Sequence, residues 1–394
     1  MIQPMTPLKF ILPLGFLVSS SAALCQQTGT VVGKTPGSAP RIGLTVTRVI
    51  PKPTCETTPS VPSGEVAHVP EMWFGRSWDD LVCVRHPDGR TEQIHSDVPH
   101  GVPSADGSEI AYWNSQKHEL HIFLLASHSD LLVESLPNAN LRGLSWSRNG
   151  HTLSYFPTGA NPPGIRSFDV DSSKRNLFGG SFIGLVPSPD AEHVVAVSGE
   201  GVERFAITDG RREIVAKLQY PWSADYSDSG KFLGILGNTS IAEQNAPPAP
   251  TPATADDDDG PDCTGGSSAL ILQDTKTKQL MDVPYPKGFD TVLDFAFSPD
   301  EQTVAVTFGM VGCDYPGERA QIFVVSLPDL KLTSVSPEDR LSVKPVWTPD
   351  GKTIVYSDYT GSDSPLVAFE LATRKVTRLT SPGQFGPDTW LAWR

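Results

Sequence analysis

The chain has 394 residues, of which 19% are charged, and a formal net charge of −14. This acidic balance argues against nucleic acid as a partner, because DNA and RNA binding needs a basic surface, and against charge-driven docking onto anionic lipid. The 34 glycines and 36 prolines are typical of a protein built from strands and turns, since turns consume both residue types.

Residues 1–25 have the pattern of a secretory signal peptide. Lys9 supplies a positive start, residues 10–18 form an apolar run too short to cross a bilayer, and small residues at 19–23 form a cleavage region. No other stretch reaches ~18 apolar residues. We therefore predict an exported protein, periplasmic or at the cell surface, without a transmembrane segment.

The segment after the signal region begins with a cysteine and continues as a leader. Cys25 raises the alternative of a lipoprotein, but lipid-modified cysteines normally follow a small residue and here Leu24 precedes it. We therefore expect simple cleavage near this point. Residues 26–66 are rich in Thr, Pro, Ser and Gly, contain one strand-like stretch at 42–50, and are predicted to form an extended leader or linker.

From residue 67 onward one phrase recurs: a hydrophobic strand, a Ser/Thr-x-Asp-Gly-like turn and a second hydrophobic strand. Its clearest copies are residues 295–306 and 346–356. Successive copies lie 43, 41, 39, 71 and 50 residues apart when they are aligned on the residue before each turn, namely Pro103, Trp146, Pro187, Tyr226, Phe297 and Trp347. Apart from the step that contains an insertion, this is the period of a four-stranded propeller blade, so residues 67–394 are predicted to form an all-β propeller.

Each turn position has a physical reason. The Ser or Thr hydroxyl bonds the turn backbone, Pro sets φ at the first corner, Asp tolerates the second, and Gly accepts a positive φ. Ala191 and Glu301 replace that glycine in two copies, where we expect strain or another turn type. The strands after the turns are mostly apolar, which suits strands covered on both faces by neighbouring blades.

The two ends of the repeat region complement each other. Residues 389–394 match only the first half of the phrase, whereas residues 81–85, the turn at 87–90 and residues 91–94 match a second half. We predict that the C-terminal strand completes the blade begun by the N-terminal strands, because this pairing removes an open sheet edge. The propeller then has seven blades, or six if the split blade does not form.

Four cysteines remain beyond Cys25. An even number in an exported chain predicts up to two disulfides, with three connectivities, among Cys55, Cys83, Cys263 and Cys313. Because Cys263 and Cys313 lie in neighbouring Gly-rich loops, we expect them to pair, which leaves Cys55 for Cys83. The absence of a Cys-x-x-Cys motif argues against a zinc or thiol-redox site.

An acidic, Pro-rich insertion at residues 243–266 interrupts the repeats. Its carboxylates could attract Ca²⁺, and they are Asp256, Asp257, Asp258, Asp259 and Asp262. An EF-hand register fails, because Gly260 at the sixth position puts Ala255 at the first. We predict a solvated loop without a cofactor; an alternative is a partner-binding flap on one propeller face, held at its base by the Cys263–Cys313 bond.

Other motifs favour packing over chemistry. The nearest approach to a nucleophile elbow, residues 75–79, lacks the final Gly and precedes no helix. His118 and His121 would point to opposite faces of a strand, which favours a polar surface over a metal pair. Tryptophans at repeat anchors, including Trp146 and Trp347, are explained by packing between blades.

The turn phrase, as in Thr348-Pro-Asp-Gly-Lys-Thr-Ile354, resembles the WD-like repeats of TolB-type β-propellers and is similar to propeller domains of prolyl-oligopeptidase-type enzymes. The resemblance covers residues 78–394. It implies a periplasmic propeller that binds partner proteins in the cell envelope. The α/β domain that precedes the TolB propeller has no counterpart, since residues 26–66 are too short and poor in helix signals.

The sequence thus predicts a non-catalytic binding scaffold of the bacterial envelope. We expect a monomer that binds an envelope protein or peptide through loops on one propeller face. The alternative is a propeller enzyme, such as a lyase, lactonase or glycan-active protein, with a polar or metal site at the central channel. The sequence leaves this alternative open because it does not reveal which loops face the axis.

Overall fold

A computed structural model describes residues 101–379, with gaps at 105–107, 239–267, 311–318, 360–364 and a few shorter positions, and the backbone of the strands at 72–76, 82–85, 91–95 and 389–393. The chain divides into two compact units, Met1–Pro51 and Lys52–Arg394, and every described residue belongs to the second. These residues form strands and turns without a helix, as the sequence predicted. No segment that could cross a membrane as a helix therefore occurs among them.

Most strands belong to four-stranded antiparallel sheets in which chain order is also spatial order. The first such sheet contains β4 (Val102–Pro103), β5 (Glu109–Asn114), β6 (Glu119–Leu124) and β7 (Ser129–Ser135). The second contains β8 (Asn140–Trp146), β9 (Thr152–Thr158), β10 (Ile165–Asp169) and β11 (Arg175–Phe178). The third contains β12 (Gly184–Pro187), β13 (His193–Ser198), β14 (Gly201–Ala206) and β15 (Arg212–Ala216). The fourth contains β16 (Pro221–Tyr226), β17 (Phe232–Gly237), β18 (Ala269–Asp274) and β19 (Leu280–Asp282).

The next strands form one eight-stranded sheet with two antiparallel halves. One half contains β20 (Thr291–Phe297), β21 (Thr303–Gly309), β22 (Ala320–Ser326) and β23 (Leu332–Ser334). The other contains β24 (Leu341–Trp347), β25 (Thr353–Tyr359), β26 (Leu366–Glu370) and β27 (Val376–Arg378). A single parallel bridge between Ala320 and Leu341 links the halves, so each half resembles the four-stranded sheets before it.

The last sheet joins strands from both ends of the repeat region. Its order is β28 (Thr389–Trp393), β1 (Met72–Arg76), β2 (Val82–Arg85) and β3 (Thr91–His95). β1 and β28 are antiparallel, with Gly75 opposite Trp390. The sequence predicted the strands now seen as β2, β3 and β28 but missed β1, which lies between them. The count of seven blades and the closure of a ring remain predictions.

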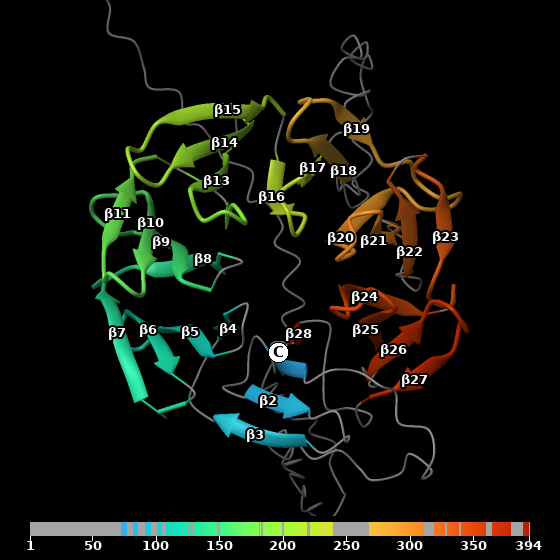
Figure 1. Ribbon diagram of the computed structural model, residues 1–394, viewed down its shortest axis with the longest axis horizontal. Helices are drawn as coiled ribbons and strands as arrows, with labels where there is room; N and C mark the ends of the chain where they lie inside the picture. Colours follow the sequence, from blue (N-terminus) through green and yellow to red (C-terminus); the bar gives the residue numbers. More distant parts are fainter. Residues whose placement is uncertain are drawn as a thin grey trace, which may run out of the picture. The chain divides into compact units, whose positions relative to one another are not determined.

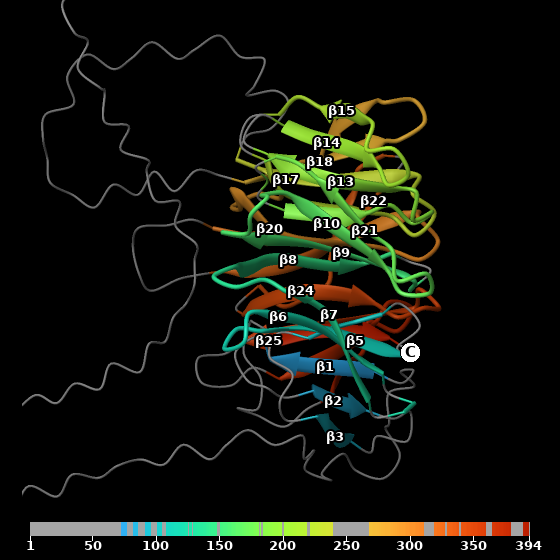
Figure 2. The same cartoon turned by 90° about the vertical axis from the view of Figure 1, so that its left-hand side faces the viewer.

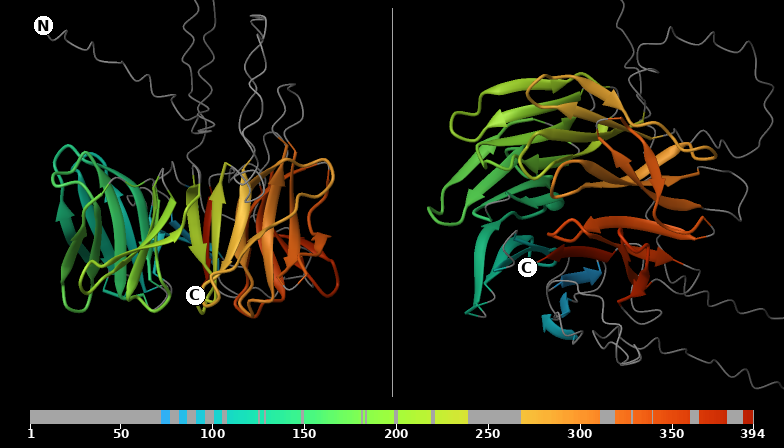
Figure 3. Two further views of the ribbon diagram at one scale, coloured as in Figure 1. Left: turned by 90° about the horizontal axis from the view of Figure 1, so that it is seen from above. Right: turned by 45° about the vertical axis from the view of Figure 1, so that its right-hand side comes forward.

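The sheets are arranged around a common centre, with the first strand of each sheet innermost. Figure 1 shows β4, β8, β16, β20 and β24 toward the middle and β7, β11, β15, β23 and β27 at the periphery. Figures 2 and 3 show that neighbouring sheets lie next to one another at the same level, with their strands running in similar directions. The innermost strands therefore face a central region, and the outermost strands leave a free edge toward the outside.

The hydrophobic core lies between neighbouring sheets. One cluster joins Phe232 and Leu272 of the fourth sheet to Phe295 and Phe308 of the next. Another joins Phe156 and Phe178 of the second sheet to residues of the third. Central strands such as β17, with every residue buried, are covered on both faces, which confirms the prediction made from their continuous apolar runs.

The repeat turns follow one geometry, including the two without glycine. Ala191 and Glu301 have φ of 57° and 55°, close to the 68° of Gly351. Each donates its N–H to the backbone carbonyl oxygen of the Ser three residues earlier. Both residues therefore adopt the left-handed conformation, which is unfavourable for residues with a Cβ. The expectation of strain is confirmed, and the alternative of another turn type is wrong.

The turn hydroxyls link the two strands of each hairpin. Ser298 Oγ donates to Asp300 Oδ1 at 2.6 Å and accepts the N–H of Thr303 at 3.0 Å. The same hydroxyl position is almost fully buried in all six copies, at Ser104, Ser147, Ser188, Ser227, Ser298 and Thr348. A buried hydroxyl must be hydrogen-bonded, so the repeated Ser/Thr is a structural requirement of the hairpin.

Candidate functional site

The sequence-predicted site residues fall outside the described residues. The acidic loop with Asp256–Asp259 and Asp262, and the cysteines Cys55, Cys263 and Cys313, lie there, and Cys83 lies on β2, of which only the backbone is described. The flap, the calcium interpretation and both disulfides therefore remain predictions. The described part of the chain offers other candidates, which the sequence did not single out.

A small pocket lies between the first and second sheets, near their outer edges. It has a volume of about 120 Å³. Its lining comes from β7, β9, β10 and β11, and consists of Glu134, Tyr155, Arg166, Arg175, Asn176 and Leu177. Since β7 and β11 each end the strand order of their sheet, the pocket lies beside two strands with free edges.

The pocket wall is a charged network that joins the two sheets. Arg166 of β10 forms an ion pair with Glu134 of β7, and Tyr155 of β9 donates to the same carboxylate at 2.6 Å. Burial, and next the hydrogen bond to Glu134, raise the pKa of Tyr155 well above its usual range, so this hydroxyl remains a donor. Arg175 donates to the carbonyl oxygen of Val133.

The network has more donors than acceptors. Arg166 and Arg175 contribute two positive charges, and Glu134 contributes one negative charge. The Nε of Arg166 is buried and has no hydrogen-bond partner among the described residues. One net positive charge therefore faces a small space in a chain whose net charge is −14.

Exposed leucines lie on the same two outermost strands. Leu131 and Leu132 of β7 are 37% and 49% exposed, and Leu177 of β11, which lines the pocket, is 44% exposed. Other outermost strands carry exposed aliphatic residues singly, such as Ile214 on β15 and Val376 on β27. Single exposed apolar residues are normal on protein surfaces. Leu131 and Leu177, however, lie on neighbouring edge strands beside a charged pocket and form a distinct surface, here called the β7/β11 surface. Leu132 pairs with His121 and therefore points to the opposite face of the first sheet.

A second candidate lies on the innermost strands. Asp225 of β16 and Asp294 of β20 each accept the N–H of the next residue at 2.8 Å. Burial, opposed by that N–H and by Lys344 of β24 and supported by the Asp225 carboxylate, raises the pKa of Asp294 to about 6. Three consecutive innermost strands thus bring two carboxylates and one ammonium within electrostatic reach of one another.

Bulges on the same strands expose apolar side chains. The register of β16 shifts between Pro221 and Ser223, and that of β20 between Val292 and Asp294. Trp222 and Leu293 occupy these irregularities and are 37% and 42% exposed. Bulges re-aim side chains next to functional sites in many proteins, but nothing in the repeat phrase marks these positions, so the sequence gave no reason to select them.

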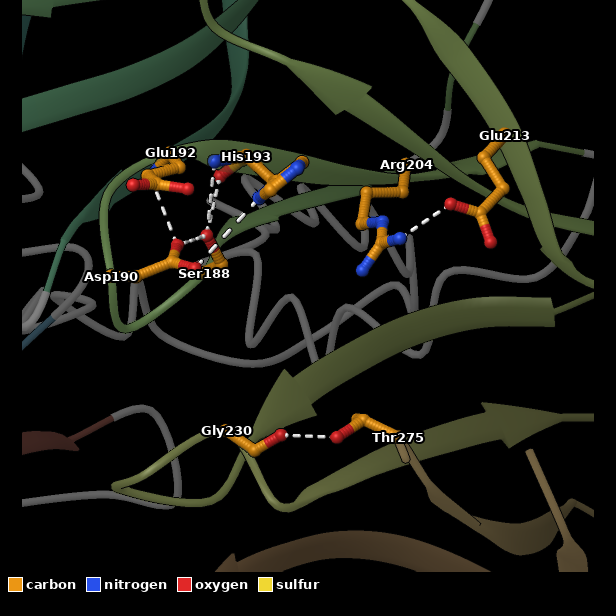
Figure 4. Close-up of polar contacts among 8 residues, drawn as sticks. All are labelled: Ser188, Asp190, Glu192, His193, Arg204, Glu213, Gly230 and Thr275. Atoms are coloured by element: carbon orange, nitrogen blue, oxygen red, sulfur yellow. Dashed lines mark hydrogen bonds and ion pairs between the residues drawn. The ribbon is translucent and has the colours of Figure 1, made fainter. Parts of the chain in front are cut away.

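A third cluster is a feature of a repeat turn. Asp190, Glu192 and His193 lie close enough together to hold a metal ion, as Figure 4 shows. Asp190 Oδ1, however, accepts from Ser188 and from the N–H of Glu192, and its other oxygen lies 3.8 Å from His193 Nδ1. Asp300 and Asp350 make the same hydroxyl and backbone bonds in turns without a histidine, so the contacts of Asp190 need no ion.

The histidines of the His118–His121 motif do not act together. His118 lies in a turn and its Nδ1 contacts the carbonyl oxygen of Ala139 at 2.7 Å. His121 is 8% exposed, lies between Glu119 at 3.1 Å and Asp130 at 2.8 Å, and stacks on Tyr112. The interpretation as a polar surface is wrong for His121, because two carboxylates allow the strand to bury the imidazole.

No family model and no curated protein matches the chain in sequence. Among solved structures, the β-propeller domain of the trilobed protease from Pyrococcus furiosus is similar at 13% identity and a TM-score of 0.55, over 79% of this chain and 94% of that one. The oligogalacturonate lyase from Vibrio parahaemolyticus is similar at 12% and 0.50, over 80% and 87%. TolB from Acinetobacter baumannii aligns at 14% and 0.45, over 82% of each chain. At such identities a likeness shows the fold alone, and the fold of this chain is that of a β-propeller.

Proposed function

We propose that the protein is a non-catalytic binding scaffold that holds a partner protein in the bacterial cell envelope. The observation that carries this proposal is the β7/β11 surface, where Leu131 and Leu177 are exposed on two neighbouring strands with free edges. Exposed apolar groups beside unpaired strand edges favour association with another chain. A partner that covers them gains apolar burial of ~25 cal/mol per Å².

The remaining parts of the proposal come from the sequence. The signal pattern of residues 1–25 supports export, and the TolB-like turn phrase supports an envelope role. The pairing of β28 with β1 supports seven blades closed by the two ends of the repeat region. The acidic loop with Asp256–Asp259 and Asp262 serves as a second contact region, pinned by Cys263 and Cys313, with Cys55 and Cys83 as the other disulfide.

Affinity capture from the native envelope fraction tests the scaffold. The double variant Leu131→Glu/Leu177→Glu places charges on the β7/β11 surface, and Ile214→Glu on β15 is the matched control, because Ile214 is 54% exposed on another outermost strand. We expect the wild type and the control to retain one stable partner at equal yield, and the double variant to lose at least nine-tenths of it. Equal capture by all three proteins contradicts this use of the surface.

A second candidate function is an enzyme with its site at the innermost strands. The observation that favours it is the raised pKa of Asp294, about 6, beside Asp225 and Lys344, since general acids and bases have pKa values near the working pH. The oligogalacturonate lyase among the structural neighbours suggests acidic oligosaccharides as first substrates. If the wild type turns over such a substrate, Asp294→Asn abolishes the turnover and no partner is captured, the enzyme function replaces the scaffold function.

A further inference from the structure

We propose that the pocket between β7 and β11 takes a side-chain carboxylate from an extended peptide segment of the partner, flanked in that segment by aliphatic residues. This inference rests on the proposed scaffold function and adds the chemistry of recognition. Two features of the pocket carry it, its size and its charge.

The size of the pocket selects a small group. Its volume of about 120 Å³ equals roughly four water molecules at ~30 Å³ each. Sites for whole metabolites are larger, at about 300–1,000 Å³. A carboxylate on a short stem fits this space.

The charge of the pocket selects an anion. Glu134 neutralises only one of the two guanidinium groups, and it is already bonded to Arg166 and Tyr155. Arg175 is exposed, and among the described residues its guanidinium donates through one nitrogen, to the carbonyl of Val133. Guanidinium groups present several donors in a fork that matches a carboxylate, so Arg175 can receive an anion without breaking the network beneath it.

The surroundings of the pocket select an extended peptide. Arg175 lies 5.5 Å over the ring of Phe168, which holds its guanidinium near the strand edge. Leu177 lines the pocket, and Leu131 lies on the same face of β7 as Glu134, so both offer apolar contacts beside it. Extended segments bind sheet edges through their backbone and place alternate side chains into pockets, so one acidic side chain between aliphatic neighbours complements this surface.

A peptide-display selection on the full chain identifies the bound sequence. Random twelve-residue peptides are selected on the wild type, with parallel selections on Arg175→Gln and on the control Arg211→Gln, an exposed arginine of the β14–β15 turn. We expect an Asp or Glu flanked by Leu, Ile or Val with the wild type and the control, and loss of the acidic position with Arg175→Gln. A consensus without an acidic residue, or no enriched peptide, overturns the inference.

Fluorescence anisotropy with the best labelled peptide then measures the carboxylate directly. We expect Kd to rise at least tenfold on Arg175→Gln and equally when the acidic residue becomes its amide, with little further loss when both changes are combined. Arg175→Lys should restore part of the affinity. Unchanged affinity of Arg175→Gln, or displacement of the peptide by acetate or succinate at the peptide's own concentration, contradicts peptide-borne recognition.

These results also separate this inference from the scaffold itself. If Leu131→Glu/Leu177→Glu abolishes partner capture while Arg175→Gln leaves it intact, the scaffold stands and the carboxylate pocket is wrong. If the peptide binds through Arg175 but the leucine variant captures the partner normally, the pocket stands and the proposed use of the leucines is wrong.

Discussion

The indole Nε1 of Trp347 donates a hydrogen bond of 2.9 Å to the backbone carbonyl of Ala296. Trp347 ends the innermost strand β24, and Ala296 lies on the innermost strand β20 of the preceding sheet half. Trp146 makes the equivalent bond to Val102, also at 2.9 Å. The anchor tryptophans therefore connect neighbouring sheets through a bond as well as through packing.

Replacing this tryptophan should weaken the contact between sheets. Trp347→Phe removes the Nε1–H, leaves the Ala296 carbonyl without its donor and shrinks a buried side chain, so we expect a loss of about 1–3 kcal/mol in the free energy of unfolding. Urea denaturation measures this loss. Trp222→Phe is the control, because Trp222 is 37% exposed and should change stability by less than ~0.5 kcal/mol. Equal effects of the two changes contradict the role of the bond.

The two turns without glycine should respond differently to the same change. Ala191→Gly relieves a left-handed residue, and we expect a gain of about 1 kcal/mol. Glu301→Gly relieves the same strain, but Glu301 also accepts hydrogen bonds from Ser229 N and Oγ, both at 2.7 Å. We therefore expect no net gain from Glu301→Gly. Thermal unfolding of both variants measures the two changes in stability. Equal stabilisation by both would show that the Ser229 hydrogen bonds contribute nothing to stability.

Gly234 of β17 lies against an aromatic ring from the neighbouring sheet. A Cβ at this position would lie 2.3 Å from Cε2 of Phe295, so Gly234→Ala should cost about 1–3 kcal/mol through forced rearrangement. Gly143→Ala on β8 is the matched control, because its nearest neighbour, Leu185 Cγ, lies at 3.5 Å. Chemical denaturation of the pair measures the difference. A neutral Gly234→Ala contradicts close packing between these sheets.

The raised pKa of Asp294 makes stability depend on pH. The folded protein holds this proton more tightly than the unfolded chain, since the pKa rises from 3.8 to about 6. The contribution of Asp294 is therefore fully present below 3.8 and is lost as pH rises through about 6. We expect Asp294→Asn to be more stable than the wild type by on the order of 1–3 kcal/mol near pH 8, with the gap closing near pH 4.

Urea titrations of both proteins across this range measure the gap. Asp225→Asn is the companion variant, because it removes the neighbouring carboxylate and should lower the pKa of Asp294, whereas Lys344→Met removes the favourable ammonium and should raise it. A gap between Asp294→Asn and the wild type that is the same at pH 4 and pH 8 contradicts the assigned pKa.

Removing residues 389–394 deletes β28, which leaves the edge of β1 without its antiparallel partner. We expect a loss of cooperative unfolding for the whole unit, because an unpaired edge between two sheets exposes apolar faces on both sides. Circular dichroism and urea denaturation measure this, with removal of Arg394 alone as the control. Truncated protein that unfolds as sharply and at the same urea concentration as the wild type contradicts the predicted closure.

The repeat phrase was sufficient to predict the two strands that flank each of its turns, because the Ser or Thr hydroxyl of every copy accepts the same backbone N–H bond. Ser298 and Thr348, for example, link the two strands of their hairpins. The residue types and their spacing along the chain are therefore enough to predict these hairpins. β1 was missed because Met72–Arg76 lies outside any complete copy of the phrase. The β7/β11 surface could not be predicted either. Arg166 and Glu134 come into contact only when two sheets pack together, and no pattern in the sequence links these two positions.

The pairing of β1 with β28 also has a consequence for the order in which the chain is made and folds. Residues 72–76 leave the ribosome long before residues 389–393, so the edge of β1 waits without its partner during nearly the whole synthesis of the unit. A factor that shields this edge would act on the nascent protein and have no place on the finished one, where β28 already occupies it.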